Sequence, residues 1–280
     1  MPMIAYHAGK AYKGRFEMTV DIEAFANNKG GVGKSFVCLN YGVARARSGE
    51  RVGFIDMDPQ ANLTRRLGLE YNPNNPILTT SEVIKSGDTG VGEQAVVNVD
   101  ISGVTVGVIP SRMDLENRVS EAGTLGAIRR LAKALDGGWL GEQFDLVCID
   151  TRPAFDHLTQ MAFAAATKIQ IVTTPEYEPV EGAQKTFKFV QERSADLMNP
   201  SLKVGGLIVN AYQELEEHDE QMKGIREYFG SLWRQPVIKH RSVVKDSVSA
   251  AGPGRAISIF DFDNRAGKQV QAALEIITTA

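Results

Sequence analysis

Short apolar segments alternate with amphipathic segments along most of this chain. Several apolar segments are continuous runs, which is typical of strands buried on both faces of a parallel sheet. The amphipathic segments carry apolar residues at every third or fourth position, as helices packed against a sheet do. The predicted strands are residues 19–26, 51–55, 104–109, 144–149, 168–173, 204–209 and 236–239. The predicted helices are residues 34–48, 62–68, 81–86, 113–135, 179–198, 216–229 and 264–278.

This alternation predicts an α/β fold with a doubly wound, mostly parallel sheet flanked by helices. In such folds ligands bind at the carboxyl ends of the strands. Residues 18–280 are predicted to form a single domain, since no low-complexity linker or internal repeat divides them. Residues 1–17 show no clear periodicity and are interpreted as a short N-terminal extension.

Composition narrows the class of protein. The chain has 280 residues, 43% of them apolar, and a formal net charge of −3, so any nucleic-acid binding needs a local basic patch. Cys38 and Cys148 lie inside apolar segments without metal-like spacing, which favours buried thiols in a reducing cytoplasm. No run approaches the ~18 apolar residues of a membrane span, and no signal peptide is recognisable. We therefore expect a cytoplasmic protein.

The most informative segment is the glycine-rich stretch from Lys29 to Ser35. Glycines let backbone N–H groups turn inward around a phosphate, and a helix beginning near Lys34 would direct its positive dipole end at the same anion. In a phosphate-binding loop Lys34 would reach the β- and γ-phosphates and Ser35 would ligate Mg²⁺. A chance glycine-rich turn is the alternative, and the strand and helix predicted on either side favour the phosphate loop. The loop residues are Lys29, Gly30, Gly31, Val32, Gly33, Lys34, Ser35 and Phe36.

The standard phosphate-loop pattern is not met in full. Asn28 stands where the pattern has its first glycine, and a second lysine, Lys29, follows it.

Two acidic motifs follow predicted strands. Asp56 and Asp58 come directly after residues 52–55, where carboxylates beside a phosphate loop can hold Mg²⁺-bound water or orient an attacking water. Asp150 ends the apolar run of residues 144–149, as a Walker B carboxylate does. Each motif is common by itself, and it is the phosphate loop in the same chain that makes them candidates.

Asn210 ends the predicted strand of residues 204–209. Its side-chain amide could pair with the edge of an adenine base. A turn-forming asparagine is an equally good interpretation.

Together these motifs resemble those of the ParA/MinD group of deviant Walker ATPases, most closely the plasmid-partition ParA proteins. The resemblance extends from about residue 19 to the C-terminus and rests on residues 28–35, 51–62, 144–150 with Pro153, and 175–182.

The resemblance implies that two subunits enclose two ATP molecules with Mg²⁺, so that nucleotide controls homodimer formation. Lys29 would be the signature lysine that reaches the partner's ATP, while Lys34 and Ser35 would act within their own subunit. Asp58 would position the hydrolytic water and help hold Mg²⁺, with further support to the metal from Asp150. Further nucleotide contacts are implied for Asp56, Asn210, Ile238 and His240.

The resemblance also implies partners: non-specific DNA on the nucleoid, and a ParB-like centromere-binding protein that stimulates slow hydrolysis. The best basic patch for DNA backbone contacts comprises Arg234, Lys239, Arg241 and Lys245, with His240 between them. Ordinary solvated charges are the alternative.

Other readings keep the ATPase but change its role. A ParA/MinD-like ATPase could position another cargo, such as a protein complex or conjugation machinery. A membrane-cycling ATPase needs a C-terminal amphipathic helix rich in Lys and Arg, and residues 269–280 lack one, so stable membrane association is not expected. A scaffold that does not hydrolyse ATP would have lost Lys29, Lys34 or Asp58, and all three are present.

Overall fold

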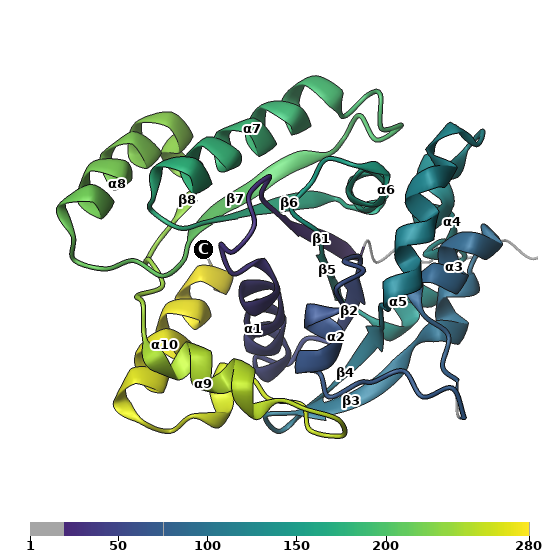
Figure 1. The fold of residues 1–280 in the computed structure, drawn as a ribbon, viewed down its shortest axis with the longest axis horizontal. Helices are drawn as coiled ribbons and strands as arrows, with labels where there is room; N and C mark the ends of the chain where they lie inside the picture. The colour runs from purple at the N-terminus through teal and green to yellow at the C-terminus, as the bar shows by residue number, and fades with distance from the viewer. Residues whose placement is uncertain (1–19, 75, 280) are drawn as a thin grey trace, which may run out of the picture.

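The computed structural model describes residues 20–74 and 76–279. Their strands form one eight-stranded sheet in the order β3-β4-β2-β5-β1-β6-β7-β8 (Figure 1). All neighbours are parallel except β3 and β4. The strands are β1 (Asp21–Ala26), β2 (Val52–Asp56), β3 (Val97–Ile101), β4 (Val104–Ile109), β5 (Leu146–Asp150), β6 (Lys168–Thr173), β7 (Lys203–Val209) and β8 (Trp233–Arg234).

Helices cover both faces of the sheet, as predicted for a doubly wound fold (Figure 1). One core cluster joins the sheet to the face covered by α3 to α8, and a second joins it to the face covered by α1, α9 and α10. The helices are α1 (Lys34–Arg47), α2 (Asn62–Arg66), α3 (Thr80–Ser86), α4 (Arg130–Ala134), α5 (Trp139–Gln143), α6 (His157–Ala165), α7 (Tyr177–Arg193), α8 (Glu216–Phe229), α9 (Ser242–Ala250) and α10 (Arg265–Thr279).

The central strands are buried along their length because helices lie on both sides. All five residues of β2 and of β5 are buried, which explains why they appear in the sequence as continuous apolar runs. The predicted fold class is confirmed. The predicted extension of residues 1–17 lies outside the described residues.

The long helix predicted for residues 113–135 is wrong. The segment is divided into two 3-10 helices, Met113–Gly123 and Ala127–Arg129, followed by α4. Thr124 is extended and Gly126 has φ +74°, a left-handed conformation that breaks a helix. Leu125, which the helical spacing would have buried, is fully exposed. The periodic apolar residues of this segment therefore do not form the buried face of a single helix.

The strand predicted for residues 236–239 is also wrong. Only Trp233–Arg234 pairs with β7, and Lys239 makes an isolated bridge with Tyr212. Pro236 has no N–H and cannot donate to a ladder, which limits strand pairing here. Among the described α-helices and strands, four further elements were not predicted: β3, α5, α6 and α9.

Predicted helix and strand boundaries also differ from the observed ones by a few residues. For example, the helix predicted for residues 179–198 begins at Tyr177 and ends at Arg193. Within the described residues no helix is both long enough and apolar enough to span a bilayer.

Candidate functional site

The glycine-rich loop connects β1 to α1 at the carboxyl edge of the sheet. Gly31 and Gly33 have φ of +81° and +86°, a region that residues with a Cβ rarely adopt, and Gly33 directly precedes α1. The first N–H groups of α1, from Lys34 to Phe36, have no acceptor within the helix. The loop and the helix start together therefore form a cradle of backbone donors suited to an anion.

Asn27, the residue just before the loop, holds it in place. Its side-chain Nδ2 donates to the carbonyls of Val172 (2.8 Å) and Pro179 (3.1 Å), and its Oδ1 accepts from the backbone N–H of Lys29 (3.0 Å). The sequence analysis missed Asn27. The only signal was a polar residue that directly follows a buried strand.

The two loop lysines lie in different environments. Lys34 is buried, and its Nζ lies 3.4 Å from the Lys29 carbonyl oxygen. Burial lowers the pKa of Lys34, while the carboxylates of Asp150 and Asp58 oppose that shift. Lys29 is more exposed and forms an ion pair with Glu178 in the first turn of α7. Lys34 therefore lies inside the site beside Asp150 and Asp58, whereas Lys29 remains at the surface.

Asp56 and Asp150 are direct neighbours across the β2–β5 pairing. Asp56 is fully buried, and its Oδ1 accepts from the N–H of Asp58 (3.0 Å). Its Oδ2 accepts from the N–H (2.9 Å) and the hydroxyl (2.7 Å) of Thr64 on α2. Burial raises the pKa of Asp56 to about 6, with the Thr64 bonds opposing the shift. These bonds make Asp56 the anchor of the Asp58 loop, and Thr64 is a site residue that the sequence analysis missed.

Asp150 presents a contrast. It is also fully buried, but among the described residues no donor meets full hydrogen-bond geometry at either carboxylate oxygen, and the Ser35 hydroxyl interacts with it only more loosely. Burial, and then the charge of Asp56, raises the pKa of Asp150 to about 8, while Ser35 and Lys34 oppose the shift. A buried carboxylate without partners is costly unless a cation or ordered water completes it. The donor set of Asp150, Ser35 and Asp58 therefore fits a hydrated Mg²⁺.

The metal would need further ligands. Among the described residues no group of three or more His, Cys, Asp or Glu side chains is arranged to hold a metal ion. Mg²⁺ commonly keeps several waters and binds through substrate phosphates with one or two protein ligands. The site suits a metal that arrives with a phosphate-bearing ligand.

We expect Asp150→Asn to stabilise the ligand-free protein at pH 8 by about 1–3 kcal/mol, because it removes a buried charge that Ser35 and Lys34 compensate only in part. Since the pKa of Asp150 is raised from 3.8 to about 8, the folded state binds the proton more tightly than the unfolded state. The contribution of Asp150 to stability is then fully present below about pH 3.8 and falls as pH rises toward 8. Melting scans in EDTA from pH 5 to pH 8.5 test this. A variant whose melting temperature declines with pH as steeply as the wild type would contradict the assignment.

The predicted adenine contacts lie together beside the loop. Asn210 Nδ2 donates to the carbonyl of Val32 (3.0 Å), and a Cβ at Gly33 would lie only 2.3 Å from that nitrogen. The backbone N–H of Ile238 donates to Val209 (2.8 Å), which fixes the following segment next to Asn210. His240 is exposed. The Ile238 side chain is fully buried, so it presents no accessible surface to an adenine base. Adenine contact stays a prediction for all three residues.

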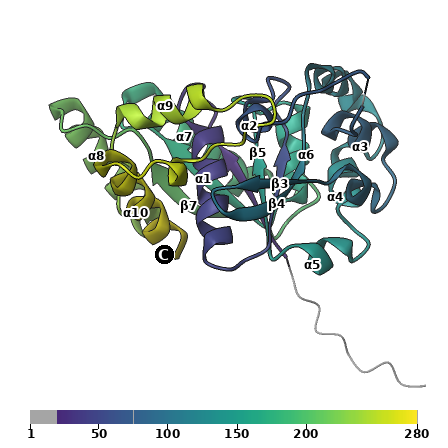
Figure 2. The same cartoon turned by 90° about the horizontal axis from the view of Figure 1, so that it is seen from below.

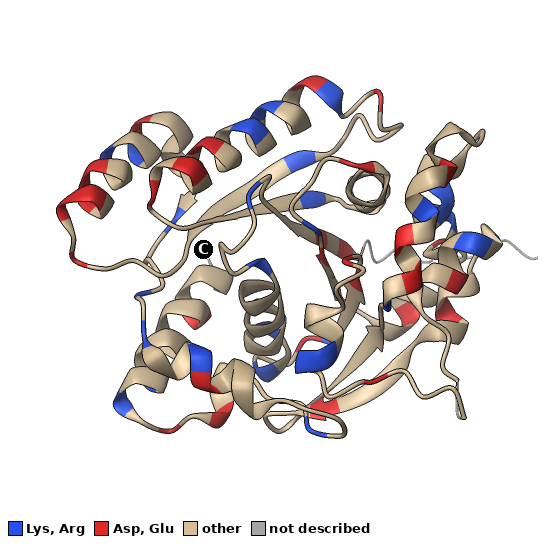
Figure 3. Cartoon of the chain, in the orientation of Figure 1, with Lys and Arg blue, Asp and Glu red and all other residues tan. Residues whose placement is uncertain are grey.

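The four candidate DNA contacts do not form one group. Lys239 and Arg241 lie on the segment that joins β8 to α9, and Lys245 lies within α9. Figure 3 shows basic positions in blue on this segment and on α9. Lys239 pairs with Glu214 (2.9 Å), so part of its charge is already matched. Arg234 is half-buried, and its guanidinium donates to the backbone carbonyl of Gly205 (3.0 Å). Arg234 therefore serves the packing of β8, and the candidate surface reduces to the other three residues.

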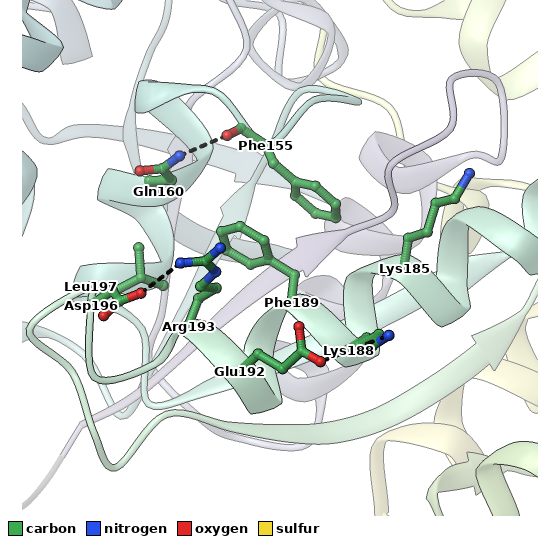
Figure 4. A pocket seen from close by; sticks show the side chains of 9 residues that line it. All are labelled: Phe155, Gln160, Lys185, Lys188, Phe189, Glu192, Arg193, Asp196 and Leu197. Carbon is green, nitrogen blue, oxygen red and sulfur yellow. Dashed lines mark hydrogen bonds and ion pairs between the residues drawn. The ribbon is translucent and has the colours of Figure 1, made fainter.

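A hollow of about 480 Å³ lies away from these residues, between the start of α6 and α7 (Figure 4). The rings of Phe155 and Phe189 stack in it with centroids 4.5 Å apart. Its charged rim is largely paired with itself, for example Arg193 with Asp196 (3.0 Å). None of the predicted site residues lines it.

Comparison with known proteins gives consistent results. The family described as AAA domain matches residues 20–204. The chromosome partitioning protein ParA of Caulobacter vibrioides is 31% identical over 259 residues, covering 91% of this chain and 93% of the relative. A solved complex of a Cyanothece McdA variant with ATP has a TM-score of 0.75 at 23% identity, covering 92% of this chain and 97% of that chain.

Cobyrinic acid a,c-diamide synthase of Mycobacterium smegmatis, solved with an ATP analogue and magnesium, has a TM-score of 0.73 at 23% identity and covers 94% of each chain. These structural similarities concern the fold alone. The matched family region contains the glycine-rich loop, Asp56, Asp58 and Asp150, and the Caulobacter relative spans nearly the whole chain. The chain belongs to the ParA/MinD family of deviant Walker ATPases.

Proposed function

We propose that this protein is a partition ATPase that acts in DNA segregation, and that residues 18–280 work as one ATPase domain. ATP with Mg²⁺ binds at the loop of residues 28–35, two subunits close around two nucleotides, and the dimer binds DNA without sequence preference. Slow hydrolysis, stimulated by a ParB-like centromere-binding protein, returns the protein to a state that releases DNA. The protein then acts in the cytoplasm, on the nucleoid.

The observation that carries this proposal is the unsatisfied carboxylate of Asp150 beneath a phosphate cradle that already contains Lys34. A magnesium ion bound together with ATP would supply the missing positive charge beside Asp150 and would help to neutralise the charge that develops during phosphoryl transfer. Ser35 and Asp150 would hold the metal directly or through water. Asp58, anchored through the Asp56 bonds, would orient the attacking water.

The choice of DNA as the surface bound by the dimer is supported by the family and by the exposed positions of Lys239 and Lys245. Retention on random-sequence duplex DNA at fixed moderate salt tests it, with Mg-ATP, Mg-ADP or no nucleotide. We expect retention only with Mg-ATP and a steep loss as salt rises, because phosphate contacts release counterions. Lys245→Gln should weaken retention. Lys203→Gln is the matched control, because Lys203 is an exposed lysine at the amino end of β7, away from the carboxyl ends of the strands. Dimerisation with ATP but without retention in any state would favour a different cargo.

Replacing Lys29 by alanine is expected to preserve ATP binding and to abolish the ATP-dependent dimer. Lys29 lies at the surface and is held only by Glu178, so it is available to a second subunit once that exposed pair opens. Exposed ion pairs contribute only about 0–1 kcal/mol, so breaking the Lys29–Glu178 pair costs little free energy. Light scattering with Mg-ATP measures the dimer. A dimer of normal affinity in the variant would remove Lys29 from the interface.

A further inference from the structure

A second hollow, of about 540 Å³, lies between the loop after Asp58, the helix α2 and the end of α9. In Figure 2, α2 and α9 lie at the same edge of the molecule. The volume falls within the range of small-molecule sites in proteins. The pocket has an apolar side, with Leu69 and Val248, and a polar side, with Ser111 and three arginines. None of the nucleotide-contact residues assigned above lines it.

Arg66 is the unusual member of this pocket. Among the described residues its guanidinium has no hydrogen-bond partner and no carboxylate within ion-pair distance; it lies over the ring of Phe36, 5.9 Å from the centroid. It is half-buried; burial lowers its pKa, and the charge of Asp150 opposes that shift. A desolvated guanidinium that no anion contacts directly is unfavourable, and arginine is the side chain best shaped to hold a phosphate with two parallel bonds.

The neighbouring charges strengthen the case. Arg65 bonds only to neutral acceptors, the Gln60 carbonyl (2.7 Å) and Asn62 Oδ1 (2.7 Å). Arg112, by contrast, is neutralised by ion pairs with Glu82 and Asp114. Among the described residues that line the pocket, Glu70 is the only acidic one. Arg65 and Arg66 thus form no ion pair with any described residue and leave an excess of positive charge in a concave site.

We propose that this pocket is a second anion site, separate from the glycine-rich loop, that binds a small phosphorylated molecule through Arg66 and Arg65. The phosphoryl group pairs with the Arg66 guanidinium, and the remainder of the ligand packs on the apolar side. A small ligand is favoured over a DNA backbone because the two arginines lie in a hollow rather than on a protruding surface. Pro59 and Gln60 also line the pocket, so an occupant contacts the loop that carries Asp58.

Equilibrium dialysis with labelled pyrophosphate tests the site, on protein saturated with Mg-ADP in excess Mg²⁺. We expect one pyrophosphate per chain without loss of ADP, and binding at least about tenfold weaker in Arg66→Gln, since one lost charged bond is worth roughly that factor. Arg65→Gln should give a smaller loss. Arg193→Gln, an exposed arginine on α7, should bind as the wild type does. Unchanged ADP binding and melting temperature in Arg66→Gln exclude a folding defect.

Other outcomes overturn the proposal. Pyrophosphate that displaces ADP, or that binds Arg66→Gln normally, would leave the pocket without a ligand role. Loss of ADP binding in Arg66→Gln would assign Arg66 to the glycine-rich loop instead. Duplex DNA that competes with pyrophosphate, together with loss of DNA retention in Arg66→Gln, would make the arginines a DNA contact. Because pyrophosphate binding is measured separately from ADP binding, failure of the proposed ATPase function would be seen independently.

Discussion

Lys34→Ala is expected to weaken ATP binding by roughly 30-fold to more than 1,000-fold, since truncating one partner of a buried charged pair costs about 2–5 kcal/mol. The Lys34 side chain is buried at the base of the phosphate cradle, where few waters can replace it. It also lies near Asp150 and Asp58, whose negative charges the bound phosphates would face without it. Titration calorimetry with Mg-ATP measures the effect.

Lys29→Ala is the matched control for this experiment. It removes the same charge from the same loop, only five positions earlier, but from an exposed side chain. At protein concentrations too low for dimers to form, we expect its affinity for Mg-ATP to stay within about threefold of the wild type, because the Lys29 side chain lies at the surface beside Glu178 and not in the cradle. If Lys34→Ala bound ATP as tightly as Lys29→Ala does, the loop would not be a phosphate site.

The second large effect is expected from Asp58→Ala. Turnover of ATP should fall by roughly 100-fold to 10,000-fold, the usual contribution of a residue that activates a reacting water. ATP binding should persist, because Asp58 accepts its recorded bond from Gln60 (2.9 Å) and not from the cradle. The variant is therefore expected to accumulate as an ATP-bound dimer. Single-turnover hydrolysis and light scattering on the same samples measure the two properties.

Asp56→Asn separates catalysis from anchoring. Asp56 has bonds to Thr64 and to the Asp58 backbone, so its replacement should lower the melting temperature and loosen the loop. Asp58 has no comparable set of bonds, and Asp58→Ala should change the melting temperature little. Normal turnover in Asp58→Ala, together with a stable but inactive Asp56→Asn protein, would transfer the role of water activation to Asp56.

The positions of the site residues could be predicted because each directly follows or ends a strand. In a parallel sheet the carboxyl ends of β1, β2 and β5 meet at one edge, so the glycine-rich loop, Asp56 and Asp150 are brought together by topology alone. The roles of these residues stay predictions. The hydrogen bonds that hold these residues in place could not be predicted. Asn27 donates to Val172, which is 145 positions away, and no local sequence pattern links the two.

The missed and mistaken elements have physical reasons of the same kind. Seven of the nine residues of α6 are buried, so the helix has no polar face to produce a helical period. The segment of residues 113–135 shows the opposite case. Its apolar residues have helical spacing, but glycines within it break the helix, and the spacing alone gives no sign of this. Neither error affects the site, because neither segment forms the carboxyl ends of β1, β2 or β5.

The two outer strands of the sheet have a consequence for self-association. β8 is only two residues long, and the Arg234 side chain is engaged with the backbone of Gly205. At the other end, β3 alternates exposed polar residues such as Asn98 and Asp100 with partly buried ones. Short or polar border strands discourage the backbone pairing through which chains join edge to edge. Two copies of the chain therefore have little main chain to share through the described sheet, and any contact between them is left to side chains.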